Sequence, residues 1–419
     1  AQADFFPKSL ESVVEMEKPL LHPDLDGKSS TLLVQIAFAL IGLASSVLWN
    51  QLMLCVVVLT ELYGKSALAQ AATAQNAMCA MAMIILTFGQ RLIPTAQMSA
   101  RYRLFLCACS LLSMIMFSLG FVFASTVYHV EGAKEVFLLI VGLNGLCTGM
   151  SQNLAASIST ISPGASGALL FGESMSPLVA VAICTLTELS RCSSVEQAAA
   201  WTLLQAQMFV IAAFVACIFL WYSGAVNGTA APTIVECVIE GGEAREYVLH
   251  RVAQLICNAV VAFCCCCGWV FLLCSSPFIA EGLCGSNAVC STLLPQRMIF
   301  ISNMAATFGR LMGLKVGTQP WLPSLVLEGL MLLCFVLLIT FACIGGRLIE
   351  ASFTTALAMG LSIFGGLTLW SNFLLMRNDH SAQRSCGHSI ILPCHVTTEV
   401  MWLAIQLGSI AGTCLAASL

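Results

Sequence analysis

Arg310 lies in the stretch SNMAATFGRL (302–311), which is otherwise apolar or small and has no carboxylate within two helical turns. A guanidinium is a planar fork of N–H donors, suited to sugar hydroxyls or to the acceptor atoms of a base. On a helix, Asn303 and Thr307 share the face of Arg310, which predicts a polar face turned to an aqueous cavity. In the alternative, the arginine snorkels to a membrane surface near Lys315.

Gln152 lies near the end of a second unusual stretch, GLNGLCTGMSQN (142–153). Its amide donates and accepts hydrogen bonds together, which suits the edge of a base. Gly142, Gly145 and Gly149 precede it at spacings of three and four, a pattern typical of close helix packing. We expect the glycines to pack against a helix and Gln152 to contact a ligand.

Glu173 is a carboxylate in the apolar fifth run of the chain. A carboxylate within a membrane needs a partner, water or a proton. It could pair with Arg310 across a cavity, act as a proton site, or stand in a wet cavity without a role. Glu328, at the start of the ninth apolar run, is the rival partner for Arg310.

Trp49 and Asn50 end the first apolar stretch, GLASSVLWN (42–50). A tryptophan at this depth usually belongs to the core or to an interface belt, although its face can also stack on a base. Asn372, which follows Trp370 and Ser371, is a further polar candidate within a span.

These side chains belong to an integral membrane protein. Of the 419 residues, 59% are hydrophobic and only 9% are charged, and the mean hydropathy is +0.92. Soluble chains carry roughly 25% charged residues. Eleven runs are long enough to cross a bilayer as helices. They cover 31–59, 66–88, 103–127, 136–158, 166–189, 199–222, 252–275, 298–314, 323–345, 350–376 and 397–418.

A polar connector at 223–250 divides these runs into a six-helix part (31–222) and a five-helix part (251–419), after a polar tail at 1–30. With the N-terminus in the cytosol, eleven of the 17 Lys and Arg residues fall inside and five outside, with Arg310 in the membrane. This bias predicts a cytosolic N-terminus and an extracellular C-terminus. The sequon at Asn227 would then lie in the cytosol and stay unmodified.

Most of the 22 cysteines lie in apolar runs, where cysteine behaves as a small hydrophobe. Cys284 and Cys290 could form a disulfide if their loop is extracellular. The last connector contains a cluster of Cys386, His388, Cys394 and His395. It could form a zinc site or belong to a flexible loop.

The chain carries no His-rich metal triad, no G-x-S-x-G elbow and no phosphate-binding P-loop sequence. It has no sizeable soluble segment to host catalysis and no nucleic-acid-type basic patch. We therefore expect a carrier, a receptor-like protein or a channel rather than an enzyme, without cofactor, metal or nucleic-acid partner.

Six stretches, in order, resemble motifs of the equilibrative nucleoside transporter family, and the resemblance extends over nearly all of the membrane region. They are GLASSVLWN (42–50), GQRLIP (89–94), GMSQN (149–153), FGESMSP (171–177), SNMAATFGR (302–310) and WSNF (370–373). The resemblance implies an all-α polytopic, major-facilitator-like fold, in which six helices pack against five with the substrate between them. It also implies that Trp49 and Met53 contact the base, that Gln152 bonds the base, and that Arg310 bonds the sugar or base.

One position departs from the family pattern. Where the family has an Asp four residues before its Arg, this chain has Ala306. Glu173 is our candidate for the missing carboxylate, because the family usually has a neutral residue there. The short connector and the many cysteines resemble divergent, protozoan-type members, which import purines. The resemblance therefore implies adenosine, inosine or hypoxanthine as substrate.

The expected mechanism is facilitated diffusion by alternating access, performed by a monomer in the plasma membrane. Three alternatives remain open. The chain could carry another small polar solute, couple transport of a nucleoside or nucleobase to protons through Glu173, or act as a receptor or scaffold without transport.

Overall fold

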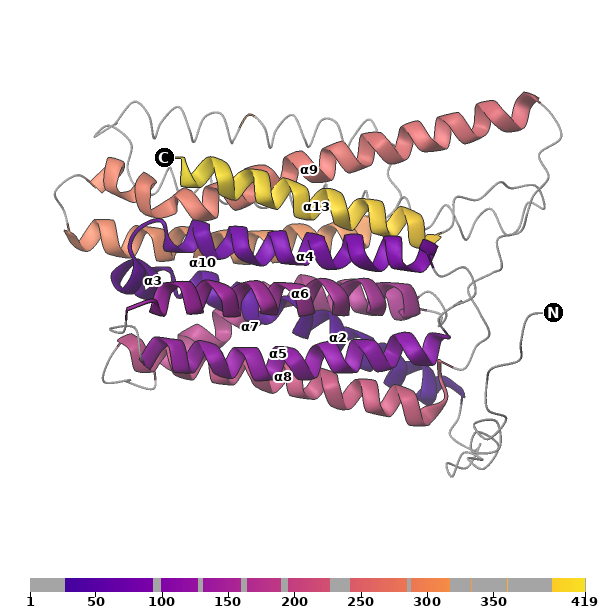
Figure 1. Cartoon of the computed structure of the whole chain (residues 1–419), viewed down its shortest axis with the longest axis horizontal. Helices are drawn as coiled ribbons and strands as arrows, with labels where there is room; N and C mark the ends of the chain where they lie inside the picture. Colours follow the sequence, from indigo (N-terminus) through magenta and orange to yellow (C-terminus); the bar gives the residue numbers. More distant parts are fainter. Residues whose placement is uncertain are drawn as a thin grey trace, which may run out of the picture.

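The computed structural model describes residues 27–92, 99–126, 131–159, 164–189, 195–226, 242–284, 288–316 and 394–418, with the single positions 333 and 360. Every long element in this part of the chain is a helix (Figure 1). The helices are α2 (Gly27–Leu54), α3 (Val56–Tyr63), α4 (Ala67–Leu92), α5 (Ala100–Thr126), α6 (Ala133–Ser159), α7 (Ala165–Leu189), α8 (Val195–Ser223), α9 (Gly242–Cys284), α10 (Ala288–Val316) and α13 (Cys394–Ala417).

The all-helical, multi-pass prediction is confirmed. Among the described helices, eight are long and apolar enough to cross a bilayer. α10 is not one of the eight, although it covers the predicted span 298–314. The predicted spans 323–345 and 350–376 lie outside the described residues apart from positions 333 and 360, as does the sequon at Asn227.

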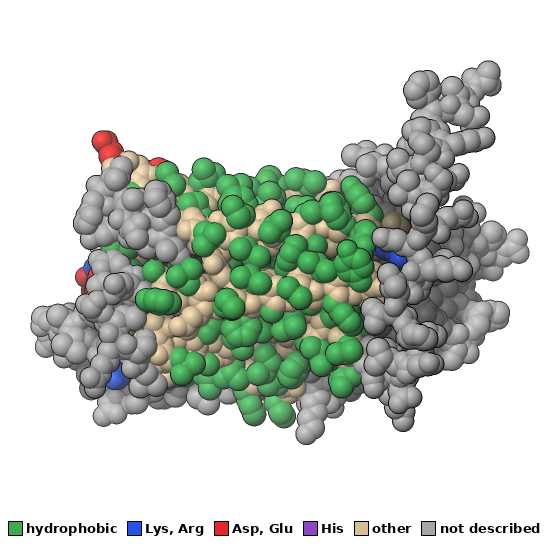
Figure 2. Space-filling model, turned by 90° about the horizontal axis from the view of Figure 1, so that it is seen from below, with side chains coloured by type: hydrophobic (Ala, Val, Ile, Leu, Met, Phe, Trp, Pro, Cys, Tyr) green, Lys and Arg blue, Asp and Glu red, His purple; other side chains and the backbone are tan. Residues whose placement is uncertain are grey.

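On the face shown in Figure 2, a broad belt of hydrophobic side chains covers the middle of the molecule, and the charged side chains in view lie toward its two ends. Large apolar side chains on α5 and α8 are exposed, among them Met116, Leu119, Met208 and Val215. In water such a surface would be unfavourable, whereas lipid tails match it. The bilayer normal therefore runs along the helices.

The helices pack as two groups, which we call the first and second helix groups. In the first, α2 packs on α7 and α8, α4 packs on α6, and α5 packs on α6 and α8. In the second, α9 packs on α10 and α13. The groups meet where α13 packs on α4 and where α10 packs on α7. The six-plus-five division stays a prediction, because two of the five later spans lie outside the described residues.

The first predicted span is interrupted. We expected one helix over 31–59, but Cys55 separates α2 from α3 with a backbone ψ of 19°. α3 ends at Gly64, whose φ of 89° is favourable for glycine and whose N–H caps the carbonyl of Thr60. No Gly or Pro lies near the interruption, so its sequence gives no local signal for it.

The connector and the following span also differ from the prediction. α9 begins at Gly242, inside the range 223–250 expected to be a loop, and continues for 43 residues to Cys284. Its first part extends past the bundle (Figure 1). Cys284 is disulfide-bonded, as the sequence allowed, whereas the side chain of Cys290 lies outside the described ones.

Glycines bring three helix pairs into backbone contact. Gly42 and Gly172 lie where α2 crosses α7, and a Cβ on either would overlap a backbone carbonyl of the other helix. The predicted packing of the α6 glycines is confirmed: a Cβ on Gly149 would lie 2.6 Å from the carbonyl oxygen of Cys79 on α4. Gly408 and Gly412 bring α13 equally close to α9. Small residues at such crossings let membrane helices approach closely.

Two membrane helices contain a Ser-Pro pair with the same internal repair. Proline has no N–H, so it leaves the carbonyl four residues earlier without its helical donor. In α7, where Pro177 interrupts the ladder, the Oγ of Ser176 donates to the carbonyl of Glu173 at 3.0 Å. In α9, Ser276 precedes Pro277, and its Oγ donates to the carbonyl of Leu273 at 2.7 Å.

Two apolar clusters join the helix groups at different depths. The α3 cluster contains Leu52, Met53, Leu59, Leu68, Val270, Phe271 and Ile299. The Trp402 cluster contains Cys79, Met83, Leu170, Leu255, Cys266, Met401, Trp402 and Ile405. At the α3 end, Lys65 also pairs with Glu281 of α9, and both side chains are about half exposed.

Replacing Gly172 with alanine is expected to destabilise the protein, because the added methyl would overlap the backbone carbonyl of Ala39 on α2. Overpacking costs about 1–3 kcal/mol. The measurement is the thermal unfolding midpoint in detergent, which should fall. On the same helix, Gly167→Ala is the matched control, since nothing lies within 4 Å of its added methyl. An equal fall in both variants would contradict the packing argument.

Candidate functional site

A cavity of about 120 Å³ lies between the two helix groups. A cavity needs roughly 10–15 Å³ to hold one water, so this one has room for several. It lies between the α3 cluster and the Trp402 cluster. Along α4, its lining residue Asn76 falls between Ala72, which belongs to the α3 cluster, and Cys79, which belongs to the Trp402 cluster. The lining residues are Ser46, Trp49, Asn50, Asn76, Gln152, Glu173, Cys265, Cys266, Trp269, Val270, Ala306, Arg310, Trp402, Ile405, Gln406 and Ser409.

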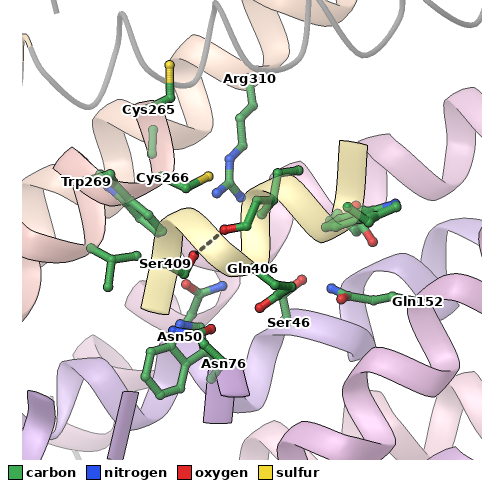
Figure 3. Close-up of a pocket in the computed structure, with 16 residues that line it drawn as sticks. Ser46, Asn50, Asn76, Gln152, Cys265, Cys266, Trp269, Arg310, Gln406 and Ser409 are labelled. Carbon is green, nitrogen blue, oxygen red and sulfur yellow. Dashed lines mark hydrogen bonds between the residues drawn. The ribbon is translucent and has the colours of Figure 1, made fainter. Parts of the chain in front are cut away.

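Five of the nine predicted site residues line this cavity. They come from four helices: Trp49 and Asn50 from α2, Gln152 from α6, Glu173 from α7, and Arg310 from α10. In Figure 3, Arg310, Gln152 and Asn50 surround one central space from different helices. The cavity therefore collects polar side chains that are far apart in the sequence.

The guanidinium of Arg310 lies over the indole of Trp269, with 5.5 Å from its Cζ to the ring centroid. A cation over an aromatic face at this distance is stabilised by the ring's electrons. Stacking fixes the plane of the guanidinium, so its N–H donors are oriented before a ligand arrives. Ala306, one turn before Arg310, also lines the cavity, so the position where the family has Asp faces the same space.

Glu173 is 3% exposed. Its Oε1 accepts a hydrogen bond from Ser45 of α2 at 3.5 Å, whereas Oε2 has no hydrogen-bond partner among the described residues. Glu173 and Arg310 both line the cavity. In the described part of the chain, the ion pair with N···O within 4.0 Å joins Lys65 to Glu281. A direct Glu173–Arg310 pair is therefore not formed.

Asn50 is held by the Ser-Pro repair of α7. Its Nδ2 donates to the Oγ of Ser176 at 2.8 Å, and that hydroxyl donates in turn to the carbonyl of Glu173. One serine thus orients an amide on α2 and satisfies the carbonyl that Pro177 leaves without a donor. Asn50 is 2% exposed, so its orientation depends on this partner.

Gln152 is positioned by the glycine contact between α6 and α4. Gly149 allows the backbone of α4 to come close, and the thiol of Cys79 lies 4.0 Å from the Oε1 of Gln152 as a weak donor. The amide is 6% exposed and lines the cavity. The glycine pattern and the glutamine of this stretch therefore belong to one arrangement.

Four predicted site residues do not line the cavity or cannot be placed. Met53 is fully buried in the α3 cluster. Asn303 is also fully buried, and neither of its amide atoms has a partner among the described residues. Thr307 donates to the backbone carbonyl of Asn303 at 2.9 Å. Asn372, like the rival carboxylate Glu328, lies outside the described residues.

Of the predicted polar face of α10, Arg310 lines the cavity, whereas Asn303 and Thr307 do not. Asn303 lies two turns before Arg310, at a depth where α10 packs against α7 and α9, so the surrounding helices cover it. The residues of α10 that line the cavity are Ala306 and Arg310.

Several lining residues were not predicted. Asn76 of α4 and Gln406 of α13 are amides within apolar spans, so the rule that selected Gln152 could have found them. Trp269 and Trp402 add two indoles to Trp49, and no pattern in their spans distinguished them. The cavity therefore combines aromatic faces, amides, one carboxylate and one guanidinium, a set that can bind a small, planar and polar ligand.

No protein-family profile matches this sequence, and no curated protein matches it either. Solved structures do. The proton:xylose symporter XylE bound to 6-bromo-6-deoxy-D-glucose is 11% identical, with a TM-score of 0.55 over 92% of this chain and 86% of the symporter. Inward-open XylE from E. coli is 10% identical, with a TM-score of 0.54 over 94% of this chain and 89% of that one.

The nucleoside transporter NupG is also similar, at 11% identity with a TM-score of 0.52 over 92% of this chain and 90% of NupG. At this identity the similarity shows the fold. The predicted major-facilitator-like fold is therefore confirmed, whereas membership of the equilibrative nucleoside transporter family stays a prediction.

Ser176→Ala is expected to lower stability, because it leaves the Nδ2 of Asn50 and the carbonyl of Glu173 without their partner. An unsatisfied buried polar group costs about 1–3 kcal/mol. The matched control is Ser275→Ala in α9, whose hydroxyl donates to Phe271 one turn earlier in its own helix. Thermal unfolding of the purified variants compares them. Equal midpoints for the two variants would show that Ser176 has no bridging role.

Proposed function

We propose that this protein carries nucleosides, purine nucleosides first among them, across a membrane by alternating access. The observation that supports this most directly is the cavity between the helix groups, where Arg310 and Gln152 lie beside three indoles. Amides suit the edge of a base, indoles suit its face, and a guanidinium suits sugar hydroxyls or ring acceptors. An aliphatic metabolite would not use the aromatic faces.

The structural neighbours agree with a carrier of small polar solutes. NupG is a nucleoside transporter and XylE is a proton:xylose symporter. A xylose-type substrate would rely mainly on hydroxyl-binding groups, and its C–H face would cover an indole less completely than a planar base does. The indoles therefore favour the nucleoside over the sugar.

Alternating access fits the placement of the cavity. The α3 cluster lies on one side of it along α4 and the Trp402 cluster on the other. Opening one cluster while the other stays packed would expose the cavity to one side of the membrane. We further propose that the carrier is a plasma-membrane monomer with its N-terminus in the cytosol, as the charge bias predicts.

In this proposal Glu173 supplies the carboxylate that the family pattern has at position 306. It lines the cavity opposite Arg310 and keeps one oxygen without a partner among the described residues. The carboxylate and the guanidinium then belong to different helix groups, rather than to one helix. A ligand that binds both holds the two groups together.

A second candidate, proton-coupled transport, has one specific observation in its favour. Glu173 is a nearly fully buried carboxylate within a membrane helix, and such residues commonly carry protons in transporters. Facilitated diffusion needs no such coupling. The two candidates share the substrate and differ in their response to a pH gradient.

Arg310→Ala is expected to reduce nucleoside uptake roughly 10- to 100-fold, because hydrogen bonds from a charged group contribute about 1.5–3 kcal/mol. Arg310→Lys keeps the charge but loses the planar fork, so uptake by this variant should lie between that of wild type and that of Arg310→Ala. The assay is uptake of tritiated adenosine in a nucleoside-import-deficient cell, normalised to surface expression.

In the same assay, unlabelled xylose should not compete with adenosine, and unlabelled inosine should. Competition by xylose alone would favour a sugar carrier, and wild-type uptake after Arg310→Ala would remove the arginine from the site.

Facilitated diffusion predicts that adenosine uptake into proteoliposomes is the same with and without an imposed pH gradient. Proton coupling through Glu173 predicts instead a stimulation that Glu173→Gln abolishes. A stimulation that survives in Glu173→Gln would show coupling through another group.

A further inference from the structure

Asn76 and Gln406 line the cavity from opposite helix groups and have no role in the proposal above. Asn76 belongs to α4 and Gln406 to α13, and these helices pack against each other where the groups meet. Each side chain is only 7% exposed. Figure 3 labels both among the residues around the pocket.

Each amide leaves one atom unsatisfied within the described part of the chain. For Asn76 it is the donor Nδ2, and for Gln406 it is the acceptor Oε1. Most buried polar atoms in native proteins have a partner, and leaving one without costs about 1–3 kcal/mol. Two such atoms of opposite type, on two residues that line one cavity, therefore need a common explanation.

We infer that Asn76 and Gln406 together bind the hydrogen-bonding edge of a nucleobase. The missing partners are one acceptor, for Asn76 Nδ2, and one donor, for Gln406 Oε1. A lactam edge, such as the N–H and C=O of a 6-oxopurine, supplies both side by side. The terminal torsions of Asn and Gln are broad, so each amide can turn to the ligand without leaving its rotamer.

This inference rests on the proposed function and adds a basis for specificity. A site built to bond a ligand's donor rejects an analogue that lacks it, because the protein acceptor then stays unpaired. The two amides belong to different helix groups, so a base that bonds both also links α4 to α13. A ligand without the full edge can occupy the cavity but cannot make this link.

The test compares two ligands of nearly the same shape. Inosine carries the N–H and C=O edge, whereas purine riboside has the same ring and sugar but only acceptor atoms on that edge. In uptake of tritiated adenosine, wild type should be inhibited by inosine at a concentration about tenfold or more below that needed for purine riboside, as expected for one hydrogen bond with its buried partner. In Gln406→Leu and Asn76→Leu the preference for inosine should fall to within about threefold.

Inhibition by purine riboside is the internal control for folding, since a misfolded variant loses both ligands. Thr413→Val is the matched control on α13, because its hydroxyl donates to Ile410 in its own helix and it does not line the cavity. It should keep the wild-type preference. A wild-type protein that transports nucleosides with no preference for inosine, or variants that keep that preference, would overturn this inference alone. Absence of any nucleoside uptake by wild type would overturn the proposed function first.

Discussion

Close backbone contact at glycines is the constraint on which the cavity depends. Gly172 brings α7 against α2, Gly149 brings α6 against α4, and Gly408 brings α13 against α9. Lipid offers little hydrophobic driving force between helices, so packing at small residues has to stabilise these pairs. The glycines lie within one turn of Glu173, Gln152 and Gln406 on the same helices. A shift at any crossing would therefore move a polar side chain of the site.

The cavity also concentrates the electrostatic cost of the fold. A guanidinium and a carboxylate both lie at membrane depth, where isolated charges are unfavourable. Each of the two groups has a contact that lowers this cost. The guanidinium of Arg310 lies over the indole of Trp269, and Glu173 accepts a hydrogen bond from Ser45. Both groups also line the cavity between the two helix groups.

Sequence reasoning found the helices and five of the sixteen residues that line the cavity, because it relied on rare residues. Arg310, Glu173 and Gln152 are costly in apolar helices, so they have few places to go other than a shared polar space. It missed Asn76, and it placed Asn303 on a cavity face that packing covers. Both errors have one cause. Spacing gives the faces of a helix, but neighbouring helices decide which face and which depth remain open. The interruption at Cys55 similarly has no local signal.

The ion pair between Lys65 and Glu281 links the helix groups at the α3 end, where both side chains are half exposed. Exposed pairs contribute about 0–1 kcal/mol and are screened by salt. Such a pair changes the ratio of closed to open molecules by no more than about fivefold. Closure at this end therefore depends on the buried apolar surface of the α3 cluster, whose contribution weakens on cooling. Temperature should accordingly shift the conformational balance at this end more than ionic strength does.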